Sequence, residues 1–297
     1  MKAPGKALKS NKGDADFLDN CISLYRRVSA HLSYGRTHFP QSEVCEYLNG
    51  LVSKSHNFLY KPEKIGLSAV FKFYRLTIPE AIVRNYRYLL LSTFLFAAAM
   101  VYSWHFTAVN PENSAFFLPA GMADSISGGE LGAADWNSPI MSGIIMTNNI
   151  RVAFMAFALG IIPMGLGTAY VLLVNGLLLG SLSALAVSHG QSLTYWSLII
   201  PHGVMELMAI FISGGAGLIV GTALLRPGIH SRKDALIMAA KEALKLMGIV
   251  VPMLIAAGLI EGFFTPSGLH PVIKIAAGAA TGILMLFYFS INHLLRG

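Results

Sequence analysis

A histidine and a glutamate four residues apart stand inside a long apolar stretch of this chain. They are His202 and Glu206, in the segment PHGVMELMAI. Residues at this spacing share one face of an α-helix, one turn apart. Burying a carboxylate in a membrane costs free energy, so such a group usually has a binding partner or a functional role. The pair therefore predicts an ion-paired contact between helices, a hydrated path for an ion or solute, or part of a metal site.

The composition places this pair in a membrane protein. The chain has 297 residues, of which 54% are hydrophobic and 12% charged, and its mean hydropathy is +0.58. Soluble domains carry about 25% charged residues. Between residues 152 and 225 the one residue of unambiguous charge is Glu206. That stretch is too long for a single span, so the sequence predicts an all-α, polytopic helical membrane protein.

Hydropathy and charge predict about six transmembrane helices in residues 88–297, or four or five if the segment around Pro163 is a re-entrant hairpin. A tight turn is expected near Pro163, where LGIIPMGLG is too apolar and too short for an ordinary loop. Loop 110–141 has acidic residues and no Lys or Arg, whereas loop 226–245 is basic, which places the first outside and the second inside. Both termini are then cytoplasmic in a multi-pass protein of the cell membrane. The expected spans are approximately 88–109, 142–163, 164–187, 197–225, 247–264 and a sixth that ends near 296.

The N-terminal part is expected to hold a disordered tail, residues 1–13, and an amphipathic helical domain, residues 14–87. Residues 1–87 contain 14 Lys and Arg against 7 Asp and Glu, which accounts for the whole net charge of +7. Such a segment suits anionic lipid headgroups on the cytoplasmic leaflet. A helical hairpin without lipid contact is the alternative. No nucleic-acid-binding motif is present, so no nucleic-acid partner is expected.

Ionisable residues within the later spans all fall in the expected outer half of the membrane. Their formal charges cancel when histidine is neutral, which suits a satisfied network or a wet vestibule. His202, Glu206 and Glu261 resemble a zinc ligand set, but the two-histidine signature is missing, so neither a metal nor a cofactor is expected. Asn148, Asn149 and Asn175 can add hydrogen bonds across helices. The five ionisable residues are Arg151, His202, Glu206, Glu261 and Lys274.

Glycines recur at four-residue spacing in three of the expected spans. Small residues at this spacing allow helix backbones to approach closely. They predict a compact bundle and a surface for self-association, and we expect a homodimer. The pairs are Gly176 and Gly180, Gly217 and Gly221, and Gly278 and Gly282.

Several segments, in order along residues 15–290, resemble the stage II sporulation protein M family of integral membrane proteins. The resemblance implies a membrane scaffold, because members in endospore formers act in engulfment and hold enzymes that degrade peptidoglycan. It implies no catalytic residues, since none are established for the family. The matching segments are LYRRVSAHLSYGRTHFP, TNNIRVAFMAFALG, NGLLLG, PHGVMELMAIFISGGAGLIVG and IEGFFTP.

Three functions remain open from the sequence. The first is a non-enzymatic, homodimeric protein of the cell envelope that recruits or organises protein partners. The second is a channel or transporter that uses the polar cluster as its vestibule. The third is a metal-dependent intramembrane hydrolase, for which no nucleophile can be identified beside the cluster.

Overall fold

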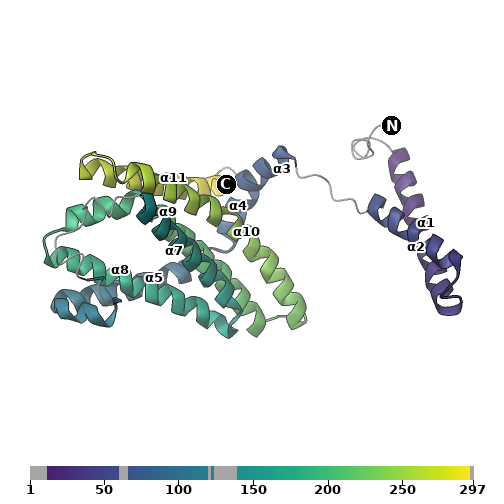
Figure 1. Cartoon of the computed structure of the whole chain (residues 1–297), viewed down its shortest axis with the longest axis horizontal. Helices are drawn as coiled ribbons and strands as arrows, with labels where there is room; N and C mark the ends of the chain where they lie inside the picture. The colour runs from purple at the N-terminus through teal and green to yellow at the C-terminus, as the bar shows by residue number, and fades with distance from the viewer. Residues whose placement is uncertain (1–11, 60–65, 120–121, 124–138, 295–297) are drawn as a thin grey trace. The chain divides into compact units, whose positions relative to one another are not determined.

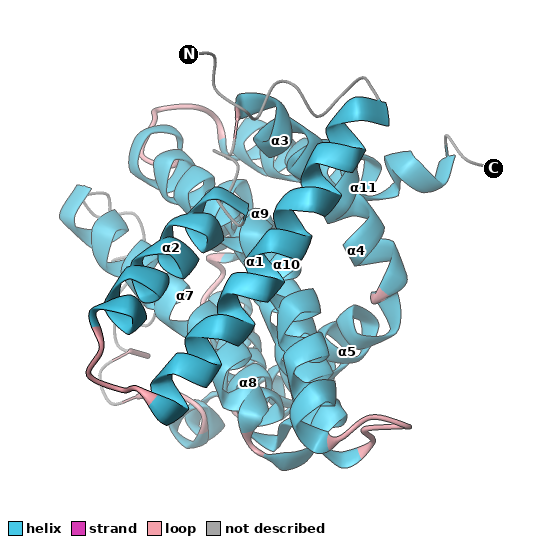
Figure 2. Cartoon of the chain, turned by 90° about the vertical axis from the view of Figure 1, so that its right-hand side faces the viewer, coloured by secondary structure: helices cyan, strands magenta, loops and turns pink. Residues whose placement is uncertain are grey.

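The computed structural model describes residues 12–59, 66–119, 122–123 and 139–294 of the chain. Every regular element in these ranges is a helix, and Figure 2 shows only helices joined by loops. The chain divides into two compact units, residues 1–70 and 71–297. Five helices of the described residues are long and apolar enough to cross a membrane. The predicted all-α polytopic membrane fold is therefore confirmed.

The first unit contains a hairpin of two helices, α1 (Lys12–His38) and α2 (Glu43–Leu59) (Figure 1). Pro40 lies in the turn between them, and the Ser42 hydroxyl accepts a hydrogen bond from the Cys45 backbone N–H at 3.3 Å. Leu32 and Cys45 are the buried side chains among those of the hairpin whose exposure is described. The hairpin therefore has almost no core of its own. The tail predicted for residues 1–13 lies outside the described residues as far as residue 11, and α1 begins at Lys12.

The second unit is a helical bundle built around α9 (Ser192–Leu225), which contacts each of the other long helices. The bundle contains the five candidate membrane spans, which lie near expected positions. The helix near the second expected span, α7, is 20 residues or about 30 Å long, and the five candidate spans lie in the other long helices. The other long helices are α5 (Tyr86–Val109), α7 (Pro139–Ala158), α8 (Leu166–Ser188), α10 (Arg232–Leu259) and α11 (Pro271–Leu294).

All six glycines of the predicted packing pairs face neighbouring helices or turns of the same chain. A Cβ atom at any of them would press on a neighbouring segment. The close approaches predicted from the spacing therefore occur within one bundle, and these glycines do not form a free self-association surface. The pairs are Gly176 and Gly180 of α8 against α5, Gly217 and Gly221 of α9 against the α7–α8 region, and Gly278 and Gly282 of α11 against α9.

The predicted tight turn near Pro163 connects α7 to α8. It consists of two short 3-10 helices, η5 (Leu159–Ile161) and η6 (Pro163–Gly165). Met164 and Gly165 both have left-handed backbones, with φ of 67° and 70°. This geometry reverses the chain sharply enough for the turn to pack on the glycine-rich part of α9.

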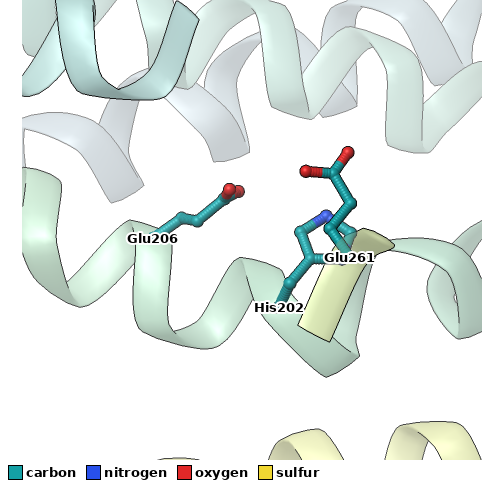
Figure 3. A group of neighbouring side chains, drawn as sticks. All are labelled: His202, Glu206 and Glu261. Carbon is teal, nitrogen blue, oxygen red and sulfur yellow. The ribbon is translucent and has the colours of Figure 1, made fainter. Parts of the chain in front are cut away.

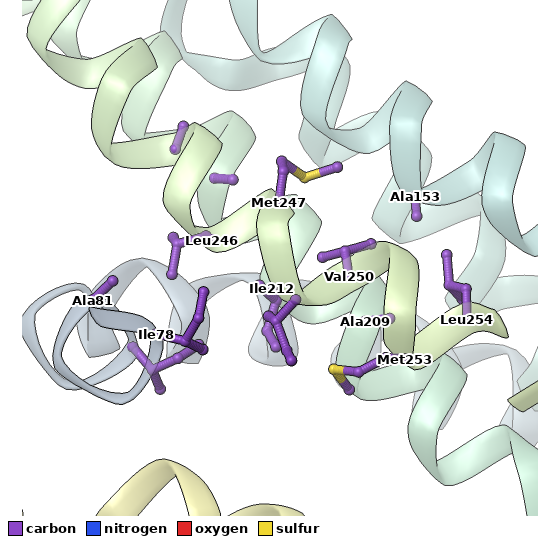
Figure 4. Close-up of a cluster of buried hydrophobic side chains, with 14 of the residues drawn as sticks. Ile78, Ala81, Ala153, Ala209, Ile212, Leu246, Met247, Val250, Met253 and Leu254 are labelled. Carbon is purple, nitrogen blue, oxygen red and sulfur yellow. The ribbon is translucent and has the colours of Figure 1, made fainter. Parts of the chain in front are cut away.

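The membrane unit begins earlier than predicted, because residues 71–87 belong to it and not to a separate domain spanning 14–87. This segment contains a π-helix, η2 (Phe73–Thr77), and α4 (Ile78–Arg84). Ile78 and Ala81 are fully buried and belong to one apolar cluster with Leu246 of α10 (Figure 4). Glu242 of α10 also accepts hydrogen bonds from Arg84 and Asn85. This last part of the expected interfacial domain is therefore covered by protein on the side that carries Ile78 and Ala81.

The basic segment predicted as loop 226–245 is a loop only as far as Ser231, because α10 begins at Arg232. The Ser231 hydroxyl accepts a hydrogen bond from the Asp234 N–H at 3.1 Å, which caps the helix. Ala239 and Ala243 then pack into the core. Arg232, Lys233 and Lys241 are exposed on this helix, which is itself part of a candidate membrane span.

The acidic loop 110–141 is described only in part. A 3-10 helix, η3 (Pro111–Phe116), follows α5, and Leu118 is buried beside α8 and α9. Residues 124–138, with Asp124, Glu130 and Asp135, lie outside the described residues.

Docking of α4 on α10 can be tested with Ile78→Ala. Ile78 has no exposed surface, so its truncation leaves a cavity and should lower the free energy of unfolding by about 2–5 kcal/mol. Ile229→Ala is the matched control, because Ile229 is 98% exposed and its truncation should change little. Thermal unfolding of the detergent-solubilised proteins measures both, and equal melting temperatures would contradict the packing of α4 in the core.

Candidate functional site

Two helical segments supply the three clustered residues His202, Glu206 and Glu261. His202 and Glu206 lie one turn apart on α9, directly after Pro201. Pro201 lacks the N–H that would bond the carbonyl of Ser197, so it interrupts the hydrogen-bond ladder just before the histidine. Glu261 lies on η7 (Ile260–Phe264), a π-helix that continues α10. Single π-turns inside α-helices are frequent at functional sites.

The side chains of His202, Glu206 and Glu261 converge (Figure 3). One potential ligand atom from each lies within 4.8 Å of the others. The three residues are 7%, 7% and 5% exposed, so the cluster is enclosed by protein. The sequence predicted that these residues share a cluster, and the structure brings all three together.

Thr265 and Lys274 extend this cluster through hydrogen bonds. The Nδ1 atom of His202 lies 3.2 Å from the Thr265 Oγ1. The Thr265 hydroxyl donates to the carbonyl of Ile260 at 3.3 Å, so its oxygen is free to accept from Nδ1–H. In the tautomer with the proton on Nδ1, Nε2 of His202 carries the lone pair. The buried Lys274 ammonium donates to the Thr265 carbonyl at 2.7 Å.

The two carboxylates are incompletely satisfied. The side-chain amide of Asn149, on α7, is a hydrogen-bond partner of Glu206. Oε1 of Glu206 and Oε2 of Glu261 are buried without a hydrogen-bond partner. No described Lys or Arg forms an ion pair with either glutamate. Unpartnered buried carboxylate oxygens are costly, which makes them candidates for binding something that the polypeptide does not supply.

Three of the predicted polar residues do not join the cluster. Arg151 and Asn148 are exposed, and the Asn175 amide donates to the Val171 carbonyl of its own helix at 2.7 Å. Arg151 is two positions from Asn149, which corresponds to about 200° around a helix. Since Asn149 faces Glu206, Arg151 points away from it.

Thr265 is the site residue that sequence reasoning missed. It is 6% exposed and contacts both His202 and Lys274 through hydrogen bonds. Its position four residues after Glu261 is the signal that could have drawn attention to it. The π-helix between them has no sequence signature that the apolar pattern would reveal.

Comparison with known proteins assigns the chain to a family. A model of the family described as "Stage II sporulation protein M" matches residues 92–266, which is more than half of the chain. The chain belongs to the stage II sporulation protein M family. The match includes His202, Glu206, Glu261 and Thr265, whereas Lys274 lies beyond it. A second model, "Domain of unknown function (DUF8413)", matches residues 6–61, which include the hairpin.

Two relatives come from Methanocaldococcus jannaschii. Uncharacterized protein MJ0793 is 32% identical over 124 residues, which are 41% of this chain and 69% of the relative. Uncharacterized protein MJ0706 is 29% identical over 124 residues, 41% of this chain and 54% of that relative. No solved structure matches the chain.

Proposed function

We propose that this member of the stage II sporulation protein M family is a non-enzymatic scaffold of the cell membrane, with both termini in the cytoplasm. The bundle anchors the chain, and the hairpin of α1 and α2 presents a binding surface. Support comes from the hairpin, which forms a compact unit apart from the bundle and leaves large apolar side chains exposed. The exposed side chains are Phe17, Leu24, Tyr34, Phe39, Val44, Tyr47 and Phe58.

Charge favours a protein partner over lipid for this hairpin. Residues 12–59 contain five Lys and Arg and five Asp and Glu, so the hairpin has no formal net charge. Residues 60–87 contain six Lys and Arg against two Asp and Glu. The excess positive charge that suits anionic lipid therefore lies largely in the segment leading into the bundle. The hairpin combines exposed apolar area with balanced charge, which is typical of a protein-binding surface.

A second copy of the chain is the partner that we propose for this surface. A two-helix hairpin buries little apolar area alone, whereas two hairpins can pack as a four-helix bundle. The resulting homodimer would be the unit that organises other envelope proteins.

The test is a paired charge substitution on the hairpin. Leu24→Glu combined with Tyr47→Glu should convert the dimer to a monomer and abolish complementation in cells that lack the gene. Ser33→Glu combined with Ser53→Glu adds the same charge at exposed polar positions and should leave both properties unchanged. The mass of the protein in detergent, by light scattering, gives the oligomeric state. Full complementation by the Leu24 and Tyr47 variant would contradict the proposal.

A cation channel or transporter is the second candidate. It is favoured by the buried carboxylates of Glu206 and Glu261, which lie beside the interruption at Pro201 and on a π-helix. Irregular backbone near buried polar groups is typical of transport sites. Cation flux into liposomes that Glu206→Gln abolishes would support this candidate over the scaffold.

A further inference from the structure

We infer that His202, Glu206 and Glu261 form a site for one divalent transition-metal ion of the Zn²⁺ type inside the bundle. The site is independent of the hairpin and of the proposed scaffold function. It would join α9 to the π-helix at the end of α10 through metal–ligand bonds.

The donor set suits such an ion. One imidazole nitrogen and two carboxylate oxygens are ligands that zinc and its neighbours accept, usually with a fourth position open to water. Tetrahedral zinc with bonds of about 2.0–2.2 Å holds its ligand atoms about 3.3 Å apart. The three candidate atoms lie within 4.8 Å of one another, so side-chain rotation alone could bring them to this spacing.

The negative charges of the two carboxylates in the cluster also favour binding of a cation. When ionised, Glu206 and Glu261 carry two negative charges, and no described Lys or Arg pairs with either. Lys274 is buried, but its ammonium donates to the Thr265 carbonyl and forms no ion pair with either glutamate. A divalent ion would neutralise both carboxylates. It would also satisfy the two buried oxygens without partners, Oε1 of Glu206 and Oε2 of Glu261.

Neighbouring side chains orient the candidate ligands through hydrogen bonds, as they do in known metal sites. Metal-binding histidines usually donate their second ring N–H to a fixed acceptor, which sets the tautomer. Thr265 Oγ1 lies 3.2 Å from Nδ1 and supplies that acceptor in the tautomer protonated at Nδ1, which leaves Nε2 of His202 for the ion. Asn149 holds Glu206 from the side of α7. The first ligand shell is therefore supported by two further side chains.

The experiment measures zinc on the full chain in lipid nanodiscs. We expect saturable binding of about one zinc per chain, the number that a single site holds. His202→Gln and Glu261→Gln should each lower the affinity at least tenfold. Thr265→Val should lower it about 10–100-fold by releasing the imidazole. His105→Gln and Glu112→Gln replace exposed residues of the same types and should bind like wild type.

X-ray absorption of the zinc-loaded wild-type protein keeps the test independent of variants that fail to fold. The site predicts a first shell of oxygen and nitrogen at about 2.0 Å, with scattering from one imidazole. Sulfur in the first shell would overturn the inference. So would wild-type zinc affinity in the folded His202→Gln variant, or the absence of saturable zinc binding to the wild-type chain.

Discussion

Gly217→Leu is expected to prevent assembly of the membrane bundle. Gly217 faces the carbonyl oxygen of Ala156 and the hydroxyl of Thr168, which donates to that same carbonyl at 2.7 Å. A Cβ at this position would overlap both atoms, and one of them is backbone. Because backbone cannot rotate away as a side chain can, the strain should exceed about 3 kcal/mol. Size-exclusion chromatography should show loss of the monodisperse peak.

The control for this substitution is Gly268→Ala, since an added Cβ at Gly268 meets nothing within 4 Å. It should elute and melt like wild type. Gly217→Ala should fall between the two, because it adds the overlapping Cβ without further atoms. A Gly217→Leu protein with the wild-type melting temperature would mean that α9 does not lie against the α7–α8 region as described.

Lys274→Glu should destabilise the bundle by about 3–5 kcal/mol, the range seen when a buried charge is left without its partner. Lys274 is 8% exposed, and its ammonium donates to the Thr265 carbonyl at 2.7 Å. A glutamate there would direct oxygen towards oxygen. It would also add a third buried carboxylate to a bundle that already buries Glu206 and Glu261. Thermal unfolding in detergent measures the loss.

Lys274→Met separates the effect of charge from the effect of packing. Methionine retains an unbranched chain of similar length, but it leaves the Thr265 carbonyl without its donor, which should cost about 1–3 kcal/mol. The expected order of stability is wild type, then Lys274→Met, then Lys274→Glu. Equal stability of the Met and Glu variants would contradict the burial of this side chain, because a buried unpaired carboxylate should cost more than a lost hydrogen bond.

The fold class could be predicted from the sequence because it depends on long apolar runs. A stretch such as residues 152–225 with one unambiguous charge has to cross the membrane more than once. The turn at Pro163 was visible for a similar reason, since Gly and Pro interrupt the run at one point. The close contacts of Gly176 and Gly217 followed from four-residue spacing. Their partners did not, because spacing alone does not distinguish packing within a chain from packing between chains.

The boundary between the two units could not be predicted from the sequence. The face that carries Ile78 and Ala81 looks the same whether lipid or protein covers it, and only the structure shows that α10 does. The residue at which α10 begins could not be predicted from the sequence for a similar reason. Its basic residues suggested a cytoplasmic loop, whereas they lie on the exposed face of a capped helix.

The candidate site was predictable where it depended on helical periodicity. His202 and Glu206 share a face because they are four residues apart. Glu261 could be included because it is an isolated charge in another apolar helix. Arg151 is expected in the cluster from its depth in the membrane. Its side chain instead projects from the face of α7 opposite to Asn149. The π-helix that carries Glu261 depends on a local shift in backbone hydrogen bonding. No pattern of residue types predicts that shift.

Anomalous diffraction at the zinc edge, from crystals of the full chain grown in lipid with zinc, tests the central claim most directly. We expect one anomalous peak per chain, bounded by Nε2 of His202 and the carboxylates of Glu206 and Glu261. The contradicting result is a map without such a peak. The carboxyl groups of Glu206 and Glu261 would then form hydrogen bonds with each other or with water.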